Sequence, residues 1–243
     1  MKRVAALYDI HANLPALEAV LAEIDRIEID AIVIGGDVVP GPMPRETLAR
    51  LQQLDRPVHF IRGNGELAVL GDLRGVPAQF QAGIRWNTDQ LTSEQLHWLG
   101  QWPLTRRIQI DSLSEVLFCH ATARNENELF TARTADDHVL ALFAEVHAPL
   151  VVCGHTHMQF DRTLGALRIV NAGSVGMPFG TPGAYWLLLG PDVQLRRTSY
   201  DLDRAAQRIR ASDYPGAEEF ATGNVLQPPA ADAMLEAFTP ATR

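Results

Sequence analysis

The sequence predicts an α/β protein in which two β-sheets pack face to face with helices on their outer sides. Short apolar runs rich in β-branched residues recur along the 243-residue chain, and polar or glycine-rich turns follow them. In the first half these runs alternate with helical patterns, whereas in the second half they follow one another closely, as paired strands do. The chain shows no internal repeat and no clear linker, so we expect one domain over residues 1–243.

A βαβ unit is predicted at the start of the chain. Residues 4–8, 31–34 and 58–61 have the composition of buried strands. Between the first two, apolar residues at helical spacing predict a helix over residues 14–24, with Asn13 as its N-cap and a proline in its first turn.

The remainder of the chain begins with helical segments and loops over residues 66–104, including a short helix at 93–99. We then expect a helix at 135–146, a closing helix at 201–209, and strands at 107–110, 115–119, 150–153, 159–163, 167–170, 184–189 and 193–199. Beyond about residue 215 the local signals are weak. Two alternatives stay open there, a loose tail or a small appended helix.

The composition argues against several classes of function and cellular location. The formal charge of −8 argues against binding to extended nucleic acid or to an anionic membrane, because both require a basic face. No stretch approaches the roughly 20 apolar residues of a membrane span, and charged residues come too early for a signal peptide. The two cysteines, Cys119 and Cys153, lie in apolar stretches and are expected to be buried thiols. We therefore expect a cytoplasmic protein.

Five polar segments each follow a predicted strand, and all contain metal-ligand residue types. Taken singly, each has an ordinary explanation, such as a solvated strand end, a capping aspartate or a glycine turn. Their shared position at strand ends favours a metal site, because open α/β sheets build their sites there. The candidate ligands are Asp9, His11, Asp37, Asn64, His120, His155 and His157.

The order of these motifs resembles the calcineurin-like metallophosphoesterases, and it is most similar to their small bacterial and archaeal phosphodiesterase branch. The matching residues are Asp9-x-His11, Gly36-Asp37, Gly63-Asn64, His120 and Gly154-His155-x-His157, with supporting matches at Asn13, Gly41-Pro42 and 171–176. The resemblance implies a four-layer α/β/β/α sandwich. It also implies two divalent metal ions, Mn²⁺ first and Fe, Zn²⁺ or Ni²⁺ as alternatives.

The resemblance further implies how the ligands are divided. One ion is held by Asp9, His11, Asp37 and His157, and the other by Asp37, Asn64, His120 and His155, so that Asp37 bridges them. Two divalent ions, two carboxylates and a bridging hydroxide leave a net charge of about +1, which favours a phosphate substrate. We expect in-line attack on phosphorus by that hydroxide. The catalytic candidates are Asp37 and His120, together with Asn13 and Arg124 for gripping phosphate.

One position departs from the family pattern. Many members carry a histidine directly after the asparagine ligand, where it stabilises or protonates the leaving oxygen, and this chain has Gly65. The missing general acid favours substrates with acidic leaving groups, unless another residue or a water supplies the proton. On this account Gly65→His should raise turnover of poor leaving groups.

Several readings of function remain in competition. A small phosphodiester is preferred over a phosphomonoester because of Gly65, and a nucleotide is one candidate substrate. The main rival is a catalytically weak or inactive metal-binding scaffold, which the full set of ligands disfavours. A zinc hydrolase of carbon esters is disfavoured by the charge of the centre, and a Rossmann domain by the absence of the G-x-G-x-x-G spacing. A homo-oligomer is compatible with a small enzyme of this kind.

Overall fold

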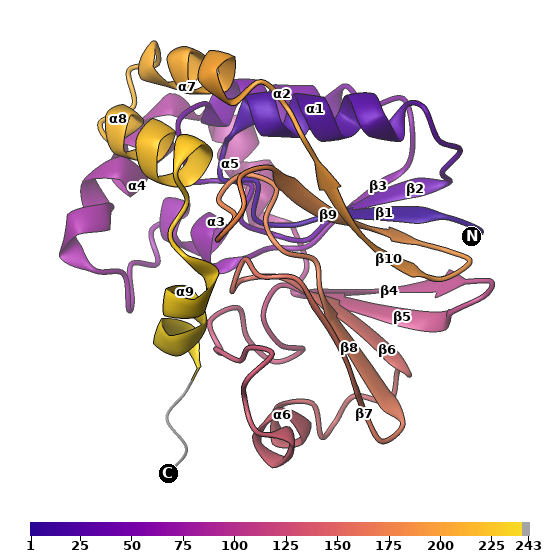
Figure 1. Cartoon of the computed structure of the whole chain (residues 1–243). Helices are drawn as coiled ribbons and strands as arrows, with labels where there is room; N and C mark the ends of the chain where they lie inside the picture. The colour runs from indigo at the N-terminus through magenta and orange to yellow at the C-terminus, as the bar shows by residue number, and fades with distance from the viewer. Residues whose placement is uncertain (240–243) are drawn as a thin grey trace.

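Two five-stranded sheets face each other in the computed structural model, which describes residues 1–239 (Figure 1). The expected domain bounds include residues 240–243, which lie outside the described residues. The first sheet has the order β10-β9-β1-β2-β3, with β1 Val4–Leu7, β2 Ala31–Ile34, β3 Val58–Phe60, β9 Ala184–Leu189 and β10 Val193–Thr198. The second has the order β4-β5-β6-β8-β7, with β4 Thr105–Ile110, β5 Ser114–Cys119, β6 Leu150–Cys153, β7 Phe160–Leu164 and β8 Leu167–Asn171.

Parallel pairing at the centre of both sheets determines where the site can form. Strands β1, β2 and β3 run parallel, as do β5, β6 and β8. The other neighbouring pairs, β1–β9, β9–β10, β4–β5 and β7–β8, are antiparallel. Because parallel strands end at the same edge of a sheet, the segments that follow them are brought together. All the candidate ligands lie in segments that follow these parallel strands.

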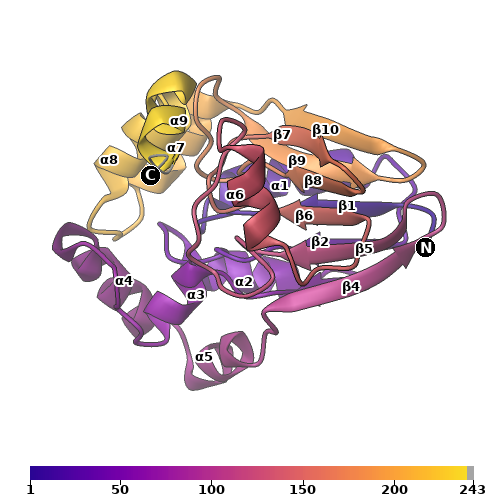
Figure 2. The same ribbon diagram turned by 90° about the horizontal axis from the view of Figure 1, so that it is seen from below.

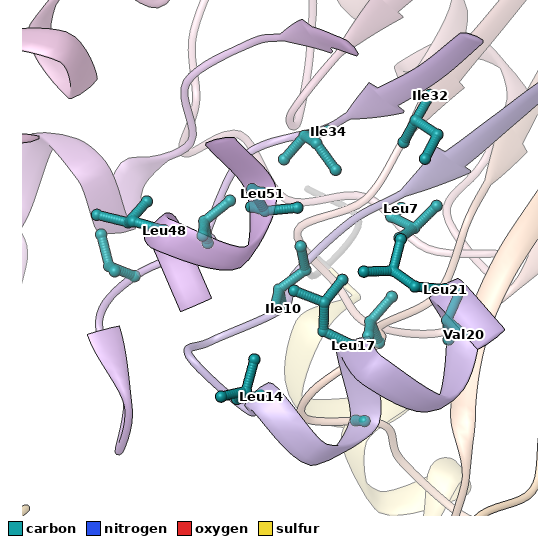
Figure 3. Close-up of a cluster of buried hydrophobic side chains, with 14 of the residues drawn as sticks. Leu7, Ile10, Leu14, Leu17, Val20, Leu21, Ile32, Ile34, Leu48 and Leu51 are labelled. Atoms are coloured by element: carbon teal, nitrogen blue, oxygen red, sulfur yellow. The ribbon is translucent and has the colours of Figure 1, made fainter. Parts of the chain in front are cut away.

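Successive side chains of β1 point to opposite faces of the first sheet and belong to different hydrophobic cores. Val4 and Ala6 point into the apolar core between the sheets, whereas Ala5 and Leu7 belong to the core on the outer side of the first sheet. That outer core packs the sheet against α1 (Leu14–Ile24) and α2 (Pro44–Gln52), as Figure 3 shows for Leu17 and Leu48. On the other side of the molecule α6 (Asp136–Leu142) covers the second sheet (Figure 2). The expected four-layer α/β/β/α sandwich is confirmed.

The remaining helices lie mostly around the edge at which the ligand segments meet. They are α3 Asn64–Val69, α4 Ala78–Gln90, α5 Ser93–Gly100, α7 Leu202–Arg210, α8 Ala217–Phe220, the π-helix η1 Ala221–Leu226 and α9 Ala231–Phe238. Helix α2 was not expected from the sequence. Its first residue, Pro44, suits the first helical turn, and its buried residues Leu48 and Leu51 lie against the first sheet.

The segment after residue 215 is helical and packed in its first part. Phe220, Ala221 and Val225 are buried in a small core that they share with α7. Helix α9 has no fully buried residue, although Phe238 lies near Phe179, with ring centroids 5.8 Å apart. Within residues 1–239 no helix combines the length and apolar character that a membrane crossing needs.

Candidate metal centre

The candidate ligands sit in loops with an unusual backbone. Five of them adopt positive φ angles, at 52° for Asp9, 46° for His11, 51° for Asp37, 67° for His155 and 60° for His157. A non-glycine residue in this left-handed region costs about 1–3 kcal/mol, and such residues cluster at functional sites. The surrounding hydrogen bonds must therefore hold these loops in place.

Backbone hydrogen bonds join the loop after β1 to the loop after β2. The N–H groups of Asp9 and His11 donate to the carbonyls of Gly36 and Asp37, at 3.1 and 2.9 Å. The segment after β8 supports the first loop from another side, because the Ser174 hydroxyl donates to the Asp9 carbonyl at 2.7 Å and the Gly176 N–H donates to the same oxygen at 3.0 Å. The main chain of Asp9 is thus held by hydrogen bonds from two neighbouring segments, and that of His11 by a hydrogen bond from one of them.

Three histidines are oriented by carbonyl groups behind them. The Nδ1–H groups of His11, His120 and His157 donate to the carbonyls of Pro40, Gly35 and Met177, at 3.2, 2.9 and 2.7 Å. A carbonyl can only accept, so Nδ1 carries the proton and the neutral ring keeps the lone pair of Nε2 free. Such a contact behind the ring is the usual way in which a metal-binding histidine is oriented.

The free Nε2 atoms converge with two carboxylates in two overlapping groups. Asp9, His11 and His157 form one, Asp9, Asp37 and His120 form the other, and within each group the ligand atoms lie within 4.8 Å of one another. Nε2 of His11 and Nε2 of His157 are 3.2 Å apart. The two oxygens of Asp37 reach both groups, because Oδ2 lies 3.7 Å from His11 Nε2 and Oδ1 lies 3.5 Å from His120 Nε2.

The last two candidate ligands lie beside His120. Oδ1 of Asn64 is 3.1 Å from His120 Nε2, and the rings of His120 and His155 have centroids 5.1 Å apart. The backbone N–H of His155 donates to Oδ2 of Asp9 at 2.9 Å. All the predicted metal-ligand residues are therefore brought together.

The residues present fit divalent cations. Oδ1 of Asp9 is completely buried and receives no hydrogen bond within the described chain, although it lies 3.4 Å from His157 Nε2 and 3.8 Å from His120 Nε2. A buried carboxylate oxygen without a donor is costly unless a cation approaches it. Imidazole nitrogens combined with carboxylate and amide oxygens are a donor set that suits first-row transition metals.

The direction of the pKa shift divides the four histidines of the site into two pairs. Burial, followed by the neighbouring His120, lowers the pKa of His155 to about 4, and burial also lowers the pKa of His11. Burial alone would lower the pKa values of His120 and His157 too, but the carboxylates of Asp37 and Asp9 outweigh it and raise both. Without a cation, His120 and His157 therefore hold their protons more tightly than an ordinary histidine.

Asp9 remains ionised in this arrangement. Burial opposes its charged form, but His157 and then His120 and His11 lower the pKa of Asp9 to about 2. A fully buried carboxylate that is negative over the whole physiological range is an anchor for a positive ion.

Glu66 lies behind the ligand loops and was not among the residues predicted to belong to the site. Its side chain is 0% exposed and accepts four backbone hydrogen bonds. Oε2 accepts from the N–H groups of Asp37 and Gly63 at 2.8 and 2.7 Å, and Oε1 accepts from Val38 and Val39 at 2.7 and 3.3 Å. Burial, and then the Asp37 carboxylate, raise the pKa of Glu66 to about 7. The only local signal was a glutamate at the third position of α3, where it can cap the helix.

Gly65 lies in a space that admits no side chain. Its N–H donates to Oδ1 of Asp37 at 2.6 Å, and a Cβ built on it would overlap the Val39 carbonyl oxygen. The histidine that is common at this position in the family therefore cannot be added here without moving the loop after β2. This corrects the expectation that Gly65→His would simply restore a proton donor.

The two candidates for gripping phosphate have other partners. Asn13 is 0% exposed, its Oδ1 accepts from Ala16 N–H at 3.2 Å as the N-cap of α1, and its Nδ2 donates to the Gly176 carbonyl at 2.9 Å. Because both ends of its amide are engaged, Asn13 shapes the loop. We therefore assign this structural role to Asn13 in place of the expected contact with phosphate. Arg124 pairs through Nε and Nη2 with Glu128 on an exposed loop. Its contact with substrate stays a prediction that requires this ion pair to open.

Comparisons with known proteins agree with the geometry. Residues 2–190 match the calcineurin-like phosphoesterase superfamily domain. An uncharacterized protein from Methanocaldococcus jannaschii is 27% identical in an alignment of 234 residues, and the match covers 87% of this chain and 93% of that protein. The crystal structure of a metallophosphoesterase from Sphaerobacter thermophilus is 28% identical with a TM-score of 0.73, covering 91% of this chain and 97% of that one.

A hypothetical protein from Pyrococcus horikoshii supports the fold. Its crystal structure has a TM-score of 0.82 at 22% identity and covers 95% of this chain and 100% of that one. The match of the superfamily domain extends over most of the chain, and the metal-ligand residues of the predicted motifs lie within it. This chain therefore belongs to the calcineurin-like phosphoesterase superfamily.

Proposed function

We propose that this protein is a two-metal phosphoesterase that hydrolyses a small phosphodiester. The proposal is carried by the two ligand groups that share Asp9, whose buried Oδ1 receives no hydrogen bond from any residue within 1–239. Asp9, His11, Asp37 and His157 would hold one ion, and Asp37, Asn64, His120 and His155 the other. When bound, such ions supply positive charge for the phosphoryl oxygens and an activated water.

The side chains of this chain have defined tasks in that reaction. Asp37 spans the two ligand groups, and the Gly65 N–H holds its Oδ1 in place. His120 and His157 are held by carbonyls so that their Nε2 atoms face the centre. Because their pKa values are raised, both rings must lose any proton before they can serve as ligands.

A diester with an acidic leaving group suits the site better than a monoester. The position after Asn64 is a glycine, and the space around it is closed by the Val39 carbonyl, so no side chain there can donate a proton to the leaving oxygen. A leaving group that departs as an anion needs no such donor.

Four further assignments belong to this proposal. Manganese is our first choice of metal, with iron, zinc or nickel as alternatives, because a mixed nitrogen and oxygen donor set accepts all of them. We place the protein in the cytoplasm, in keeping with two buried free thiols, Cys119 and Cys153. A nucleotide is a candidate substrate. A homo-oligomer is the assembly to test first, since most soluble oligomers are symmetric and of one chain.

Hydrolysis assays on metal-stripped protein test the proposal. Bis(p-nitrophenyl) phosphate and p-nitrophenyl phosphate are supplied separately, with Mn²⁺, Fe²⁺, Zn²⁺ or Ni²⁺ added in turn. We expect turnover of the diester with at least one metal. His120→Ala should abolish it, whereas His97→Ala, which alters an exposed histidine on α5, should not. Absence of turnover with every metal would reject the enzyme and favour the metal-binding scaffold.

A further inference from the structure

A cavity of about 720 Å³ opens beside the metal centre. One end is lined by the ligand His11 and by Met177, whose carbonyl orients His157. The side walls come from α4 and from residues 214–224, which lie on the same side of the molecule in Figures 1 and 2. This volume is within the range of cavities that hold small molecules.

Contacts between its walls hold the cavity in shape. A Cβ at Gly83 would lie 2.9 Å from the Tyr214 hydroxyl, so the glycine lets the tyrosine approach α4 closely. The Tyr214 ring also packs edge-on against Trp86, with centroids 5.3 Å apart. Asn87 connects α4 to the ligand loops, because its Oδ1 accepts from the Gly41 N–H at 3.0 Å. The cavity therefore keeps a fixed position relative to His11.

The lining includes three aromatic side chains and, among the described residues, no lysine or arginine. Phe80, Tyr214 and Phe220 contribute rings, and Phe80 is 60% exposed, which is high for a phenylalanine and leaves its ring available to a ligand. No lysine or arginine of the described chain lines the cavity, whereas Glu219 does. Burial, and then the Glu219 carboxylate, raise the pKa of Tyr214, which places this negative charge next to the rings.

We propose that this cavity holds an aromatic, uncharged ester group of the phosphodiester substrate and disfavours a group that carries further phosphates. The inference rests on the proposed function, because the reacting phosphate must lie at the metal centre. Aromatic rings stack on a flat apolar group, and a carboxylate without a compensating cation repels additional anions. Tyr214, Glu219 and Phe220 lie beyond residues 2–190, so this selectivity would come from a part of the chain outside the superfamily match.

Binding of two phosphonates to the manganese-loaded protein tests the cavity without turnover. Phenylphosphonate and methylphosphonate have the same metal-binding end, and calorimetry compares their Kd values. We expect the phenyl compound to bind at least about tenfold more tightly, equivalent to about 1.4 kcal/mol, and Phe80→Ala to remove most of this difference. Leu140→Ala, an exposed leucine of α6 that does not line the cavity, is the matched control. Equal affinities, or a Phe80→Ala variant that behaves like the wild type, would overturn the proposal.

The effect of the Glu219 carboxylate is tested with a third ligand. A phenylphosphonate bearing a para-carboxylate should bind about threefold more weakly than the parent compound, and Glu219→Gln should reduce this difference. Tighter binding of the carboxylate compound to the wild type would contradict the inferred selectivity.

Kinetics separate this inference from the proposed function. Methyl p-nitrophenyl phosphate and phenyl p-nitrophenyl phosphate share a leaving group and differ in the second ester. Phe80→Ala should lower kcat/KM for the phenyl ester about tenfold more than for the methyl ester, mainly through KM. If neither ester is hydrolysed, the proposed phosphodiesterase is wrong, and the phosphonate affinities alone still decide whether the cavity binds an aromatic group.

Discussion

Replacing Glu66 by glutamine removes one acceptor from the ligand loops while keeping the size of the side chain. The carboxylate accepts four buried N–H groups, two on each oxygen. The glutamine amide has one oxygen, so two of these N–H groups face an NH₂ group that cannot accept. At about 1–3 kcal/mol for each unpaired buried donor, the free energy of unfolding should fall by about 2–6 kcal/mol.

Urea unfolding at pH 8 measures this loss, since that pH lies above the Glu66 pKa of about 7 and the wild-type carboxylate is ionised. Competition with a chelator measures metal affinity on the same samples, where we expect a loss of about 10- to 100-fold, as is typical when a group that orients metal ligands is changed. Glu46→Gln is the matched control, because Glu46 lies in the first turn of α2 but is exposed.

Two results would refute the reasoning. If Glu66→Gln unfolds like Glu46→Gln, the four hydrogen bonds contribute no stability. If it is destabilised but binds metal as tightly as the wild type, then Glu66 supports the fold without positioning the ligands.

Three further predictions concern the same loops. Metal affinity should rise with pH, because the raised pKa values of His120 and His157 mean that protons must leave these rings when the metal binds. Calorimetry in buffers of different ionisation enthalpy should detect this proton release, and a metal affinity that does not depend on pH would contradict the prediction. Gly65→His should lower the melting temperature and should not raise the turnover of substrates with poor leaving groups, because the added Cβ would overlap the Val39 carbonyl oxygen. A stable variant with raised turnover would show that the loop can move to admit the side chain. Asn171→Ala should lower the free energy of urea unfolding by about 1–3 kcal/mol, since its amide donates to the Gly154 carbonyl at 2.6 Å; an unchanged midpoint would show that this bond is dispensable.

The fold and the positions of the candidate ligands could be predicted because their signals are local. Strand β2 is a run of four apolar residues followed by two glycines and Asp37, so strand, turn and ligand are adjacent in the sequence. The same arrangement recurs at β6, where His155 and His157 follow a buried apolar run. Parallel pairing then brings these strand ends to one edge, which is a general property of such sheets.

What was missed depends on partners that are distant in the sequence. Glu66 accepts a hydrogen bond from the N–H of Asp37, which lies 29 residues earlier, and no local sequence pattern predicts such a contact. The cavity joins α4 to Tyr214 across more than a hundred residues, and it exists only because a weakly patterned tail folds back over the site. Helix α2 was missed for a different reason: prolines around its start obscured a short helix that is polar on most of its surface.

The left-handed backbone of the ligand loops constrains which substitutions could remove the proposed metal site during evolution. Asparagine, aspartate and histidine are the non-glycine residues that accept this conformation most readily, and aspartate and histidine are also the residue types of the candidate ligands Asp9, Asp37 and His155. A change from aspartate or histidine to asparagine would remove a strong donor while leaving the loop intact, whereas a β-branched residue would disrupt both. A single nucleotide change converts every aspartate or histidine codon into an asparagine codon. An inactive relative that serves as a scaffold is therefore accessible by mutations that the fold tolerates.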